Sequence, residues 1–399
     1  MTVTDASQQT SQTALSMNID HAQVVANTVR STLGPKGLDK MLTDAGGRVT
    51  ITNDGATILR NVNWVSPIAK KIVEVARTQE EQCYDGTTTA IILTAELLKK
   101  AQLLLDSGVH PTSIIEGYRK AAEKGKESLD KMTVDPDEEM LLSIAKTAMT
   151  GKSAEGERDH LAKLCLEVIE ASRPEAVHIM TRTGSPISDS FSPNGIVVGR
   201  QKIHSSMPTK LTHVKVAIID GGLELEGFGQ GVNLNLASYS ESVEYQKGRK
   251  DALKAMADHL IELEANLVLV TKNIDPWIAE YLARNNVLAA RRCAASNLEA
   301  IAQATNGLIV SGYEDLEAED LGTAGSLEEV IQEGQPPYML LHDTPNNDAA
   351  SLVICAPTEE VANEIRRAMD DAMGVVWVAK NEGSIVPGGG APQVEMAQH

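Results

Sequence analysis

Three short segments near the beginning of the chain combine glycine with carboxyl or hydroxyl side chains, the residue types that bind phosphates and metal ions. Residues 32–37 read TLGPKG, residues 53–57 read NDGAT, and residues 85–89 read DGTTT directly before the apolar run AIIL. At the start of a helix, glycine and threonine present backbone N–H and hydroxyl donors to an anion. The third segment therefore predicts a phosphate-binding turn.

Asp85, the first residue of that turn, narrows the kind of site that is expected. Its carboxylate would repel a bare phosphate, whereas a hard cation such as Mg²⁺ placed between the two would attract both. An ordinary capped helix explains residues 85–89 equally well. Taken singly, residues 32–37 are an ordinary helix end and residues 53–57 an ordinary Asp-Gly turn. The three segments together are more specific than any one of them.

Helices and a strand are expected to position the first two segments. A cap at Asn18 or Asp20 predicts a helix that ends near Gly34. Its buried face should carry three valines: Val24, Val25 and Val29. Residues 49–52 alternate as a strand does and lead directly into the turn at residues 53–55.

The third segment is expected between two helices. Ser66 followed by Pro67 predicts a helix start, because a hydroxyl cap and a proline in the first turn are both favoured there. The apolar stripe of that helix should comprise Ile68, Ile72, Val75 and Ala76. The next helix should run from about residue 90 to 105, and another should follow Pro111.

The hydrophobic pattern changes between about residues 199 and 352, where predicted strands alternate with predicted helices. Strands are expected at residues 214–219, 266–270, 287–290 and 308–310, and helices over 253–263, over 277–284 and after a capping box formed by Ser296 and Glu299. This pattern predicts a sheet covered by helices, in a separate α/β domain. Residues 362–373 return to helical periodicity, so the α/β part is an insert between helical parts.

Composition limits the possible functions. The 399 residues should form two or three domains, and with 42% hydrophobic but only 3% aromatic residues their cores must rely on aliphatic side chains and the 13 Met. A net charge of −19 argues against nucleic acid and anionic membranes as partners. It fits a halophilic cytosol, and also an ordinary acidic cytosolic protein. The four separated cysteines predict reduced thiols in a cytoplasm, and no apolar run reaches the length of a membrane span.

Several segments in the same order resemble group II chaperonins of the archaeal thermosome and eukaryotic cytosolic type. The matching segments are TLGPKGLDKML, ITNDGATIL, DGTTTA, ELLKKAQLLLDSGVHPTSIIEGYRKA, IAKTAMTGKSAE, KIHSSMP, ARRCAASNLEAIAQATNG, EDLG and VPGGGAPQVEMA. They cover almost the whole chain. The resemblance implies an ATP-dependent chaperone subunit that binds unfolded proteins and uses ATP hydrolysis, with Mg²⁺, to drive ring closure and folding.

The resemblance also implies a multidomain α and α/β chaperonin architecture with three nested domains. A mainly helical equatorial domain would comprise residues 1–142 and begin again at 387–399. A small intermediate domain would comprise 143–198 and 353–386. An α/β apical domain for client binding would span 199–352 and carry a lid protrusion at 223–250, where Phe228 is either a client contact or a core or hinge aromatic.

Site residues follow from the resemblance position by position. Nucleotide binding is implied for Thr32, Leu33, Gly34, Pro35, Asp85, Gly86, Thr87, Thr88, Thr89, Lys152 and Gly389. Asp85 is implied as the magnesium ligand, and Asp54 as a catalytic carboxylate near the γ-phosphate. The family pattern D-A-x-x-V-V aligns with residues 371–376, so Asp371 rather than the neighbouring Asp370 is implied to orient or deprotonate the attacking water. Other chaperonin subunits are implied as partners in a homo- or hetero-oligomeric double ring.

Two departures from the family pattern leave alternatives open. Tyr84 stands where the family usually has glycine before the Asp, and its ring is expected to crowd the phosphates and to resist a positive φ. Family chains also continue well beyond Gly390, so the chain is expected to stop before the nucleotide-binding domain is complete, either in a truncated gene or in part of a longer one. Both departures favour a runner-up, a degenerate ring subunit that does not hydrolyse ATP. A third alternative is an enzyme for a small phosphorylated molecule, which leaves the apical insert unexplained.

Overall fold

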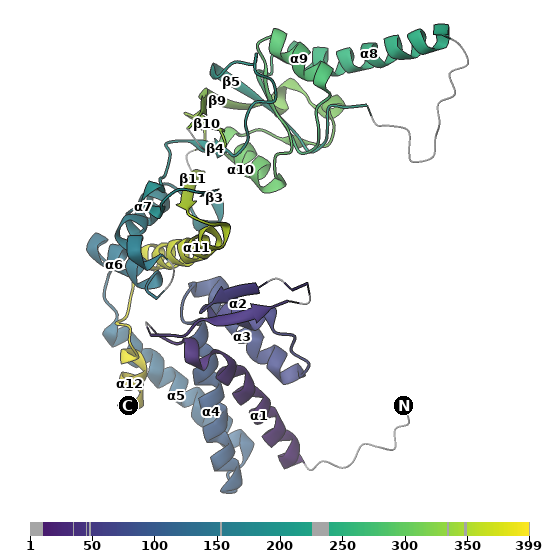
Figure 1. The fold of residues 1–399 in the computed structure, drawn as a ribbon. Coiled ribbons are helices and arrows are strands. Elements are labelled where there is room, and N and C mark those ends of the chain that lie inside the picture. Colours follow the sequence, from purple (N-terminus) through teal and green to yellow (C-terminus); the bar gives the residue numbers. More distant parts are fainter. Residues whose placement is uncertain are drawn as a thin grey trace, which may run out of the picture. The chain divides into compact units, whose positions relative to one another are not determined.

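The computed structural model describes residues 11–34, 36–44, 46–47, 49–151, 154–225, 239–332, 335–346 and 349–398. Its contacts divide the chain into two compact units, Met1–Leu166 with Asn363–His399 and Glu167–Ala362. Helices dominate the first unit and a mixed sheet dominates the second (Figure 1). The three-domain division stays a prediction.

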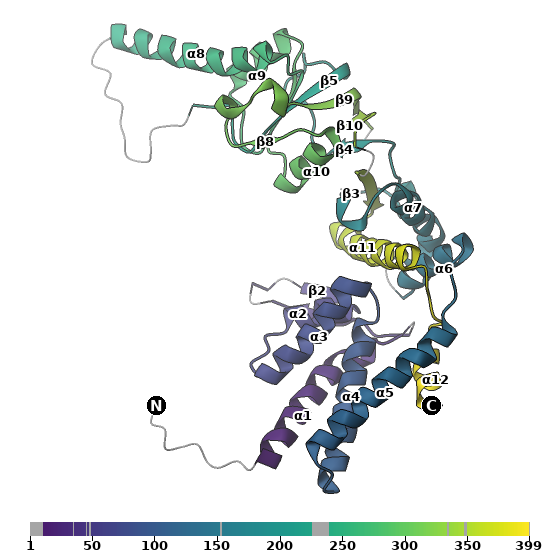
Figure 2. The same cartoon turned by 180° about the vertical axis from the view of Figure 1, so that it is seen from behind.

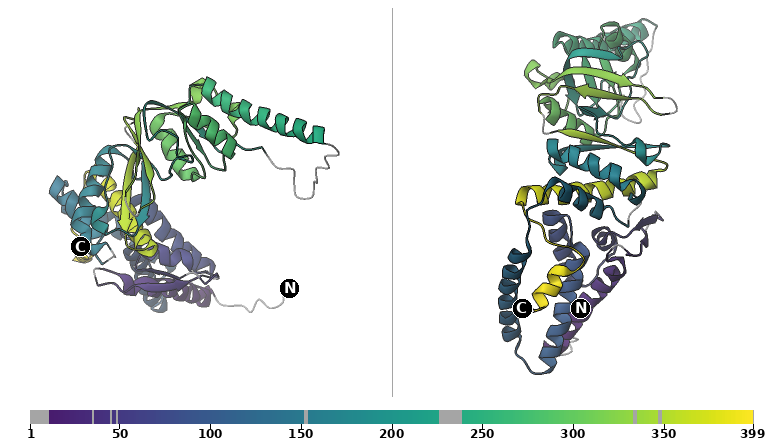
Figure 3. Two further views of the ribbon diagram at one scale, coloured as in Figure 1. Left: turned by 45° about the horizontal axis from the view of Figure 1, so that its top comes forward. Right: turned by 90° about the vertical axis from the view of Figure 1, so that its left-hand side faces the viewer.

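The first unit is built mainly from helices and one β-hairpin. Its described elements are α1 (Ser11–Val29), β1 (Lys40–Thr43), β2 (Val49–Thr52), α2 (Gly55–Asn61), α3 (Pro67–Cys83), α4 (Thr87–Asp106), α5 (Pro111–Met132), α6 (Glu138–Ala148), the first part of α7 (Arg158–Ala171), most of α11 (Glu359–Glu382) and α12 (Ala391–Gln398). The strands β1 and β2 pair antiparallel. In Figure 3 the yellow helix α12 lies beside α5, where Met396 packs over Gly125.

A shared apolar core joins α1, α2, α3 and α4. Val25 and Val29 of α1 are fully buried in it, together with Ile91 and Ala95 of α4. Val24 was predicted to share this face, but it is 56% exposed, because one step of about 100° carries it away from α4. The helix also begins at Ser11, well before the predicted cap at Asn18 or Asp20.

Local capping explains where α3 starts, as the sequence predicts. The hydroxyl of Ser66 accepts a hydrogen bond from the backbone N–H of Ala69, and Pro67 is the first helical residue. Ile72 and Ala76 are buried, but Val75 is exposed and Ala69 is buried in its place. The predicted stripe was therefore wrong at Val75, because the contact face is centred closer to Ala69.

The second unit contains two sheets and their covering helices. Its described elements are the end of α7, β3 (Val177–Thr183), β4 (Ile196–Val198), β5 (Lys210–Ile219), α8 (Tyr239–Glu262), β6 (Leu267–Val270), α9 (Pro276–Arg284), β7 (Leu288–Ala290), α10 (Ala295–Thr305), β8 (Ile309–Val310), β9 (Gly322–Val330), β10 (Tyr338–His342), β11 (Ala350–Ala356) and the first residues of α11. Parallel strands β3 and β11 form the smaller sheet.

The larger sheet has the order β4-β10-β9-β5-β6-β7, with β8 also paired to β5. Its central strand β5 pairs in parallel with β6 and β8 and antiparallel with β9. Side chains alternate between the faces: Ala217 and Ile219 pack towards α8 and α9, whereas Val216 and Ile218 pack towards α10. The predicted helix-covered sheet is confirmed (Figure 2).

Two details of the second unit differ from the sequence prediction or escape it. The predicted capping box of Ser296 and Glu299 is wrong, because the cap position is Ala294, two residues earlier, and it makes no side-chain hydrogen bond. Residues 226–238, with Phe228, lie outside the described residues, and the described chain resumes in α8 at Tyr239. Among the described helices, none combines the length and apolar content that a membrane crossing requires.

Candidate functional site

The three glycine-containing segments line one cavity of about 230 Å³ in the first unit. Its lining residues are Thr32, Leu33, Gly34, Asn53, Asp54, Gly55, Glu80, Tyr84, Asp85, Gly86, Thr87, Thr88, Thr89, Thr147, Ala148, Thr150 and Asp371. Of the predicted site residues that the structure describes, only Gly389 is not among them; it precedes α12 with φ +69°. Pro35 and Lys152 lie outside the described residues.

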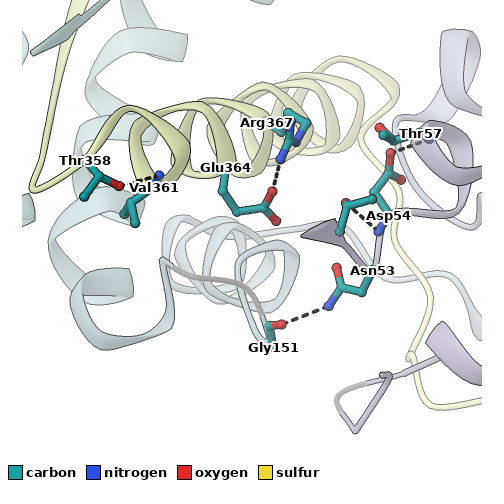
Figure 4. A network of polar contacts seen from close by, with 9 residues as sticks. Asn53, Asp54, Thr57, Gly151, Thr358, Val361, Glu364 and Arg367 are labelled. Atoms are coloured by element: carbon teal, nitrogen blue, oxygen red, sulfur yellow. Dashed lines mark hydrogen bonds and ion pairs between the residues drawn. The ribbon is translucent and has the colours of Figure 1, made fainter. Parts of the chain in front are cut away.

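Asp54 holds the start of α2. Its two carboxylate oxygens accept hydrogen bonds from the backbone N–H groups of Ala56, at 3.2 Å, and Thr57, at 2.7 Å (Figure 4). The neighbouring side chain of Asn53 donates to the carbonyl of Gly151 at 2.9 Å, which brings the residue before Lys152 next to this turn. Asp54 is therefore a helix cap as well as a cavity residue.

Gly55 allows the starts of α2 and α4 to approach each other closely. A Cβ atom at this position would lie 2.4 Å from the Oγ1 of Thr88, well inside van der Waals contact. Only glycine therefore lets the Asp54 turn lie beside residues 87–89. This packing explains how segments 30 residues apart in sequence share one cavity wall.

The turn between α3 and α4 presents Asp85 and the free N–H groups of α4. Tyr84 (φ +54°) and Gly86 (φ +76°) both adopt the left-handed conformation, with Asp85 between them. Gln79 donates to the carbonyl oxygen of Asp85 at 2.8 Å and fixes the turn. The cap residue Gly86 offers no side-chain acceptor, and the first N–H groups of a helix have no partner within it. Because residues 86–89 line the cavity, these groups are available there as anion donors.

The positive φ of Tyr84 strains the backbone of this turn. The predicted resistance of a non-glycine residue to a positive φ is real, at roughly 1–2 kcal/mol, but Tyr84 adopts the conformation all the same. Its N–H donates to the carbonyl of Glu80 at 3.0 Å and closes the end of α3. Tyr84 is among the lining residues of the cavity, and its ring lies against Gly374 of α11.

Glu80 is a cavity residue that the sequence analysis did not find. It lies one helical turn before Tyr84, and its carboxylate accepts a hydrogen bond from the hydroxyl of buried Thr87 at 2.5 Å. Burial, with smaller contributions from the carboxylates of Asp54 and Asp371, raises the pKa of Glu80, although the Thr87 hydrogen bond opposes the shift. Only the packing of α3 against α4 reveals this residue, because its sequence context, QEEQ, is that of a solvated helix.

The raised pKa predicts how Glu80 affects stability. Because the folded chain holds the Glu80 proton more tightly than the unfolded chain does, this residue's contribution is most favourable at low pH and declines as the pH rises through the folded-state pKa. Glu80→Gln should therefore raise the melting temperature by about 1–3 °C at pH 7.5 and give no gain near pH 4. Thermal unfolding at both pH values measures this. Glu81→Gln is the control, since Glu81 is exposed and pairs with Arg77; an equal gain there would contradict the prediction.

Asp371 reaches the cavity from α11, far along the sequence from the other lining residues. The adjacent Asp370 is not among the lining residues; part of the residue is exposed, yet burial raises the pKa of its carboxyl to about 6. The structure therefore favours Asp371 over Asp370 as the site residue, as the family pattern does. The last two residues of α6, Thr147 and Ala148, add to the wall together with Thr150 just after it, all within the segment IAKTAMTGKSAE.

The charges of the cavity suit a cation bound together with an anion. Four carboxylates line it, from Asp54, Glu80, Asp85 and Asp371. Among the residues that the structure describes, no group of three or more His, Cys, Asp or Glu side chains is arranged to hold a metal ion by itself. Mg²⁺ commonly takes only one or two protein carboxylates, and completes its shell with phosphate oxygens and water. One carboxylate at Asp85 beside the N–H groups of α4 fits that donor set.

Comparison with known proteins agrees with this arrangement. The model of the TCP-1/cpn60 chaperonin family matches residues 25–399. The chain is 39% identical to thermosome subunit 1 of Haloferax volcanii over 98% of its own length and 72% of that protein. It is 40% identical to a thermosome subunit of Pyrococcus abyssi, over 96% of this chain and 72% of that one. It is 37% identical to thermosome subunit alpha of Halobacterium salinarum, over 99% and 72%.

These matches test the resemblance drawn from the motifs. Similar identities to proteins of Haloferax, Halobacterium and Pyrococcus do not assign the chain to a halophile, so that origin stays a prediction, as does truncation. The multidomain α and α/β chaperonin architecture is confirmed, because the family model extends over both units. With its glycine-containing turns and four carboxylates gathered around one cavity and a family match over residues 25–399, this chain belongs to the TCP-1/cpn60 chaperonin family.

Proposed function

We propose that the cavity is the Mg-ATP site of this ATP-dependent chaperonin subunit, and that ATP hydrolysis there drives protein folding. One observation supports this proposal most strongly. The N–H groups at the start of α4, which have no helical partner, lie in the same cavity as carboxylates from the α2 turn, the α3–α4 turn and α11. Phosphoryl transfer needs charge neutralisation and an aligned water more than covalent chemistry, and this combination supplies both.

Each side chain has a role in this proposal. The N–H groups and hydroxyls of residues 86–89 bind the phosphates, and Thr32, Leu33 and Gly34, which line the same cavity, contact them too. Asp85 holds Mg²⁺, which when bound neutralises charge on the phosphates. Asp371 orients the attacking water and accepts its proton. Asp54 is proposed to act near the γ-phosphate, and Lys152 to contact it.

The wider assembly also belongs to the proposal. The thermosome subunits to which the chain is similar include subunits named alpha, beta and 1, which supports partner subunits in a homo- or hetero-oligomeric double ring. Unfolded proteins are the proposed clients, bound by the α/β domain over residues 199–352, and the cytoplasm is the proposed location. Because the chain belongs to the chaperonin family, the alternative function as an enzyme for a small phosphorylated molecule is not needed to explain the cavity.

Isothermal titration with Mg-ATP, followed by an ATPase assay, tests the site. We expect micromolar binding and steady hydrolysis. The lining position of Tyr84 favours one second candidate, a ring subunit that has lost hydrolysis. Micromolar binding with turnover would exclude that candidate, whereas binding without turnover would establish it. Absence of any nucleotide binding would contradict the proposed site. Electron microscopy of the native complex should show stacked rings.

A further inference from the structure

The ring of Tyr84 lies directly on the backbone of Gly374. A Cβ atom added at Gly374 would lie 2.1 Å from the Cγ of Tyr84, 2.2 Å from its Cδ1 and 2.7 Å from its Cδ2. These ring atoms are the closest to the tyrosine backbone, so a movement of the hydroxyl end would not make room. The contact therefore requires glycine at position 374.

This contact joins the two halves of the proposed ATP site. Tyr84 directly precedes Asp85 and the phosphate-binding start of α4. Gly374 lies three residues, nearly one helical turn, after Asp371 in α11. The ring is thus a spacer between the proposed phosphate-binding turn and the helix that carries the proposed catalytic carboxylate.

Both residues are unfavourable choices when considered locally. Tyr84 adopts the left-handed conformation, which non-glycine residues rarely do. Gly374 lies inside a 24-residue helix, where glycine is less favourable than alanine. Each makes sense in the presence of the other, because only glycine leaves space for the ring. Strain at a site of this kind points to a functional constraint.

We propose that Tyr84 is a positioning residue, whose ring rests on Gly374 and sets the separation between Asp371 and the Asp85 turn. The inference rests on the proposed function, since it assigns the spacing of that same site. It predicts that disturbing the contact lowers the turnover number and leaves the affinity for Mg-ATP nearly unchanged. A misplacement of about 1 Å can lower catalysis by about 100-fold.

Five variants of the full chain test this idea. Gly374→Ala places a methyl group against the ring, Tyr84→Gly removes the ring, and the double variant removes the ring and the clash together. Tyr84→Phe retains the ring without its hydroxyl. Gly117→Ala is the matched helical control, because Gly117 lies in α5 and a Cβ there would have nothing within 4 Å.

The measurements are kcat, the dissociation constant of Mg-ATP and the melting temperature of each variant. We expect Gly374→Ala to lower kcat at least about tenfold, with the dissociation constant within about threefold of that of the unmodified chain. The double variant should recover kcat to within about threefold of Tyr84→Gly, and the melting temperature lost in Gly374→Ala should return with it. Tyr84→Phe should keep a higher kcat than Tyr84→Gly, and Gly117→Ala should not lower kcat.

The possible failures are distinguishable. An unmodified chain that does not hydrolyse ATP overturns the proposed function, and the inference with it. Normal turnover in Gly374→Ala, or a double variant as impaired as Gly374→Ala, overturns the inference alone. A Tyr84→Phe variant as slow as Tyr84→Gly would assign the effect to the hydroxyl and overturn the ring contact as its cause. If Gly374→Ala does not fold, the comparison of Tyr84→Phe with Tyr84→Gly still decides.

Discussion

Replacing Asp371 with alanine is expected to lower kcat for ATP hydrolysis by at least about 100-fold, because a positioned general base contributes about that much. The dissociation constant of Mg-ATP should change by less than about threefold, since the proposed phosphate donors belong to residues 86–89 of a different segment. Single-turnover hydrolysis and isothermal titration of the same preparation measure the two quantities separately.

Asp370→Ala is the matched control for this change. It alters the same residue type in the same helix, one position away, where the side chain does not line the cavity. Its kcat should stay within about twofold of the original value. Full turnover in Asp371→Ala, or a loss confined to Asp370→Ala, would refute the assignment of Asp371 as the residue that handles the attacking water.

Replacing Asp85 with asparagine should weaken Mg-ATP binding by about 30-fold or more, equivalent to about 2 kcal/mol, because the side chain keeps its size but loses the charge that attracts Mg²⁺. Without Mg²⁺, the effect of the substitution on ATP affinity should have the opposite sign. In excess chelator the variant should bind ATP as well as the original chain or better, because the lost carboxylate no longer repels the phosphates. Titrations with and without Mg²⁺ therefore give opposite changes.

Asp106→Asn is a suitable control for Asp85→Asn. Asp106 lies at the other end of α4, where its side chain accepts a hydrogen bond from Gln102. Neither titration should change by more than about twofold. If Asp85→Asn weakens binding equally with and without Mg²⁺, Asp85 supports the turn rather than the metal, and the proposed ligand assignment is wrong.

Asp54 is a poorer choice for such an experiment, because its carboxylate has two functions. Its hydrogen bonds to Ala56 and Thr57 cap α2, and loss of a cap of this kind costs about 0.5–2 kcal/mol. A fall in activity after Asp54→Ala would therefore combine a displaced α2 with any lost catalytic contribution. Asp54→Asn, which retains one of the two accepting oxygens, separates the two better.

Features that depend on a few neighbouring residues could be predicted from the sequence. The start of α3 at Ser66-Pro67 and the strand β2 leading into the Asp54 turn are present, and so is the predicted helix near residue 90, although α4 already begins at Thr87 within DGTTT. The α/β alternation that gives β5, β6 and α9 is present too. Caps and strand alternation are determined within one or two turns of chain, so no distant partner is needed to recognise them.

Features that depend on packing were predicted less well. Val24 and Val75 belong to apolar stripes and yet are exposed, because periodicity identifies a helix face only to within about one residue. Ser296 resembles a cap, but α10 begins at Ala295 and its cap residue is Ala294. In each case the position of a neighbouring element decides which residue is buried and where the helix begins.

The sequence by itself determined the chaperonin family, the turn proposed to bind phosphate and the carboxylates proposed for the chemistry, because these are carried by residue types in a fixed order. The tertiary structure decided which of them meet. Glu80 enters the cavity only because α3 packs on α4, and Tyr84 fits only because Gly374, 290 positions later, leaves room for its ring. Such contacts depend on the distance between helices, and no local pattern encodes that distance.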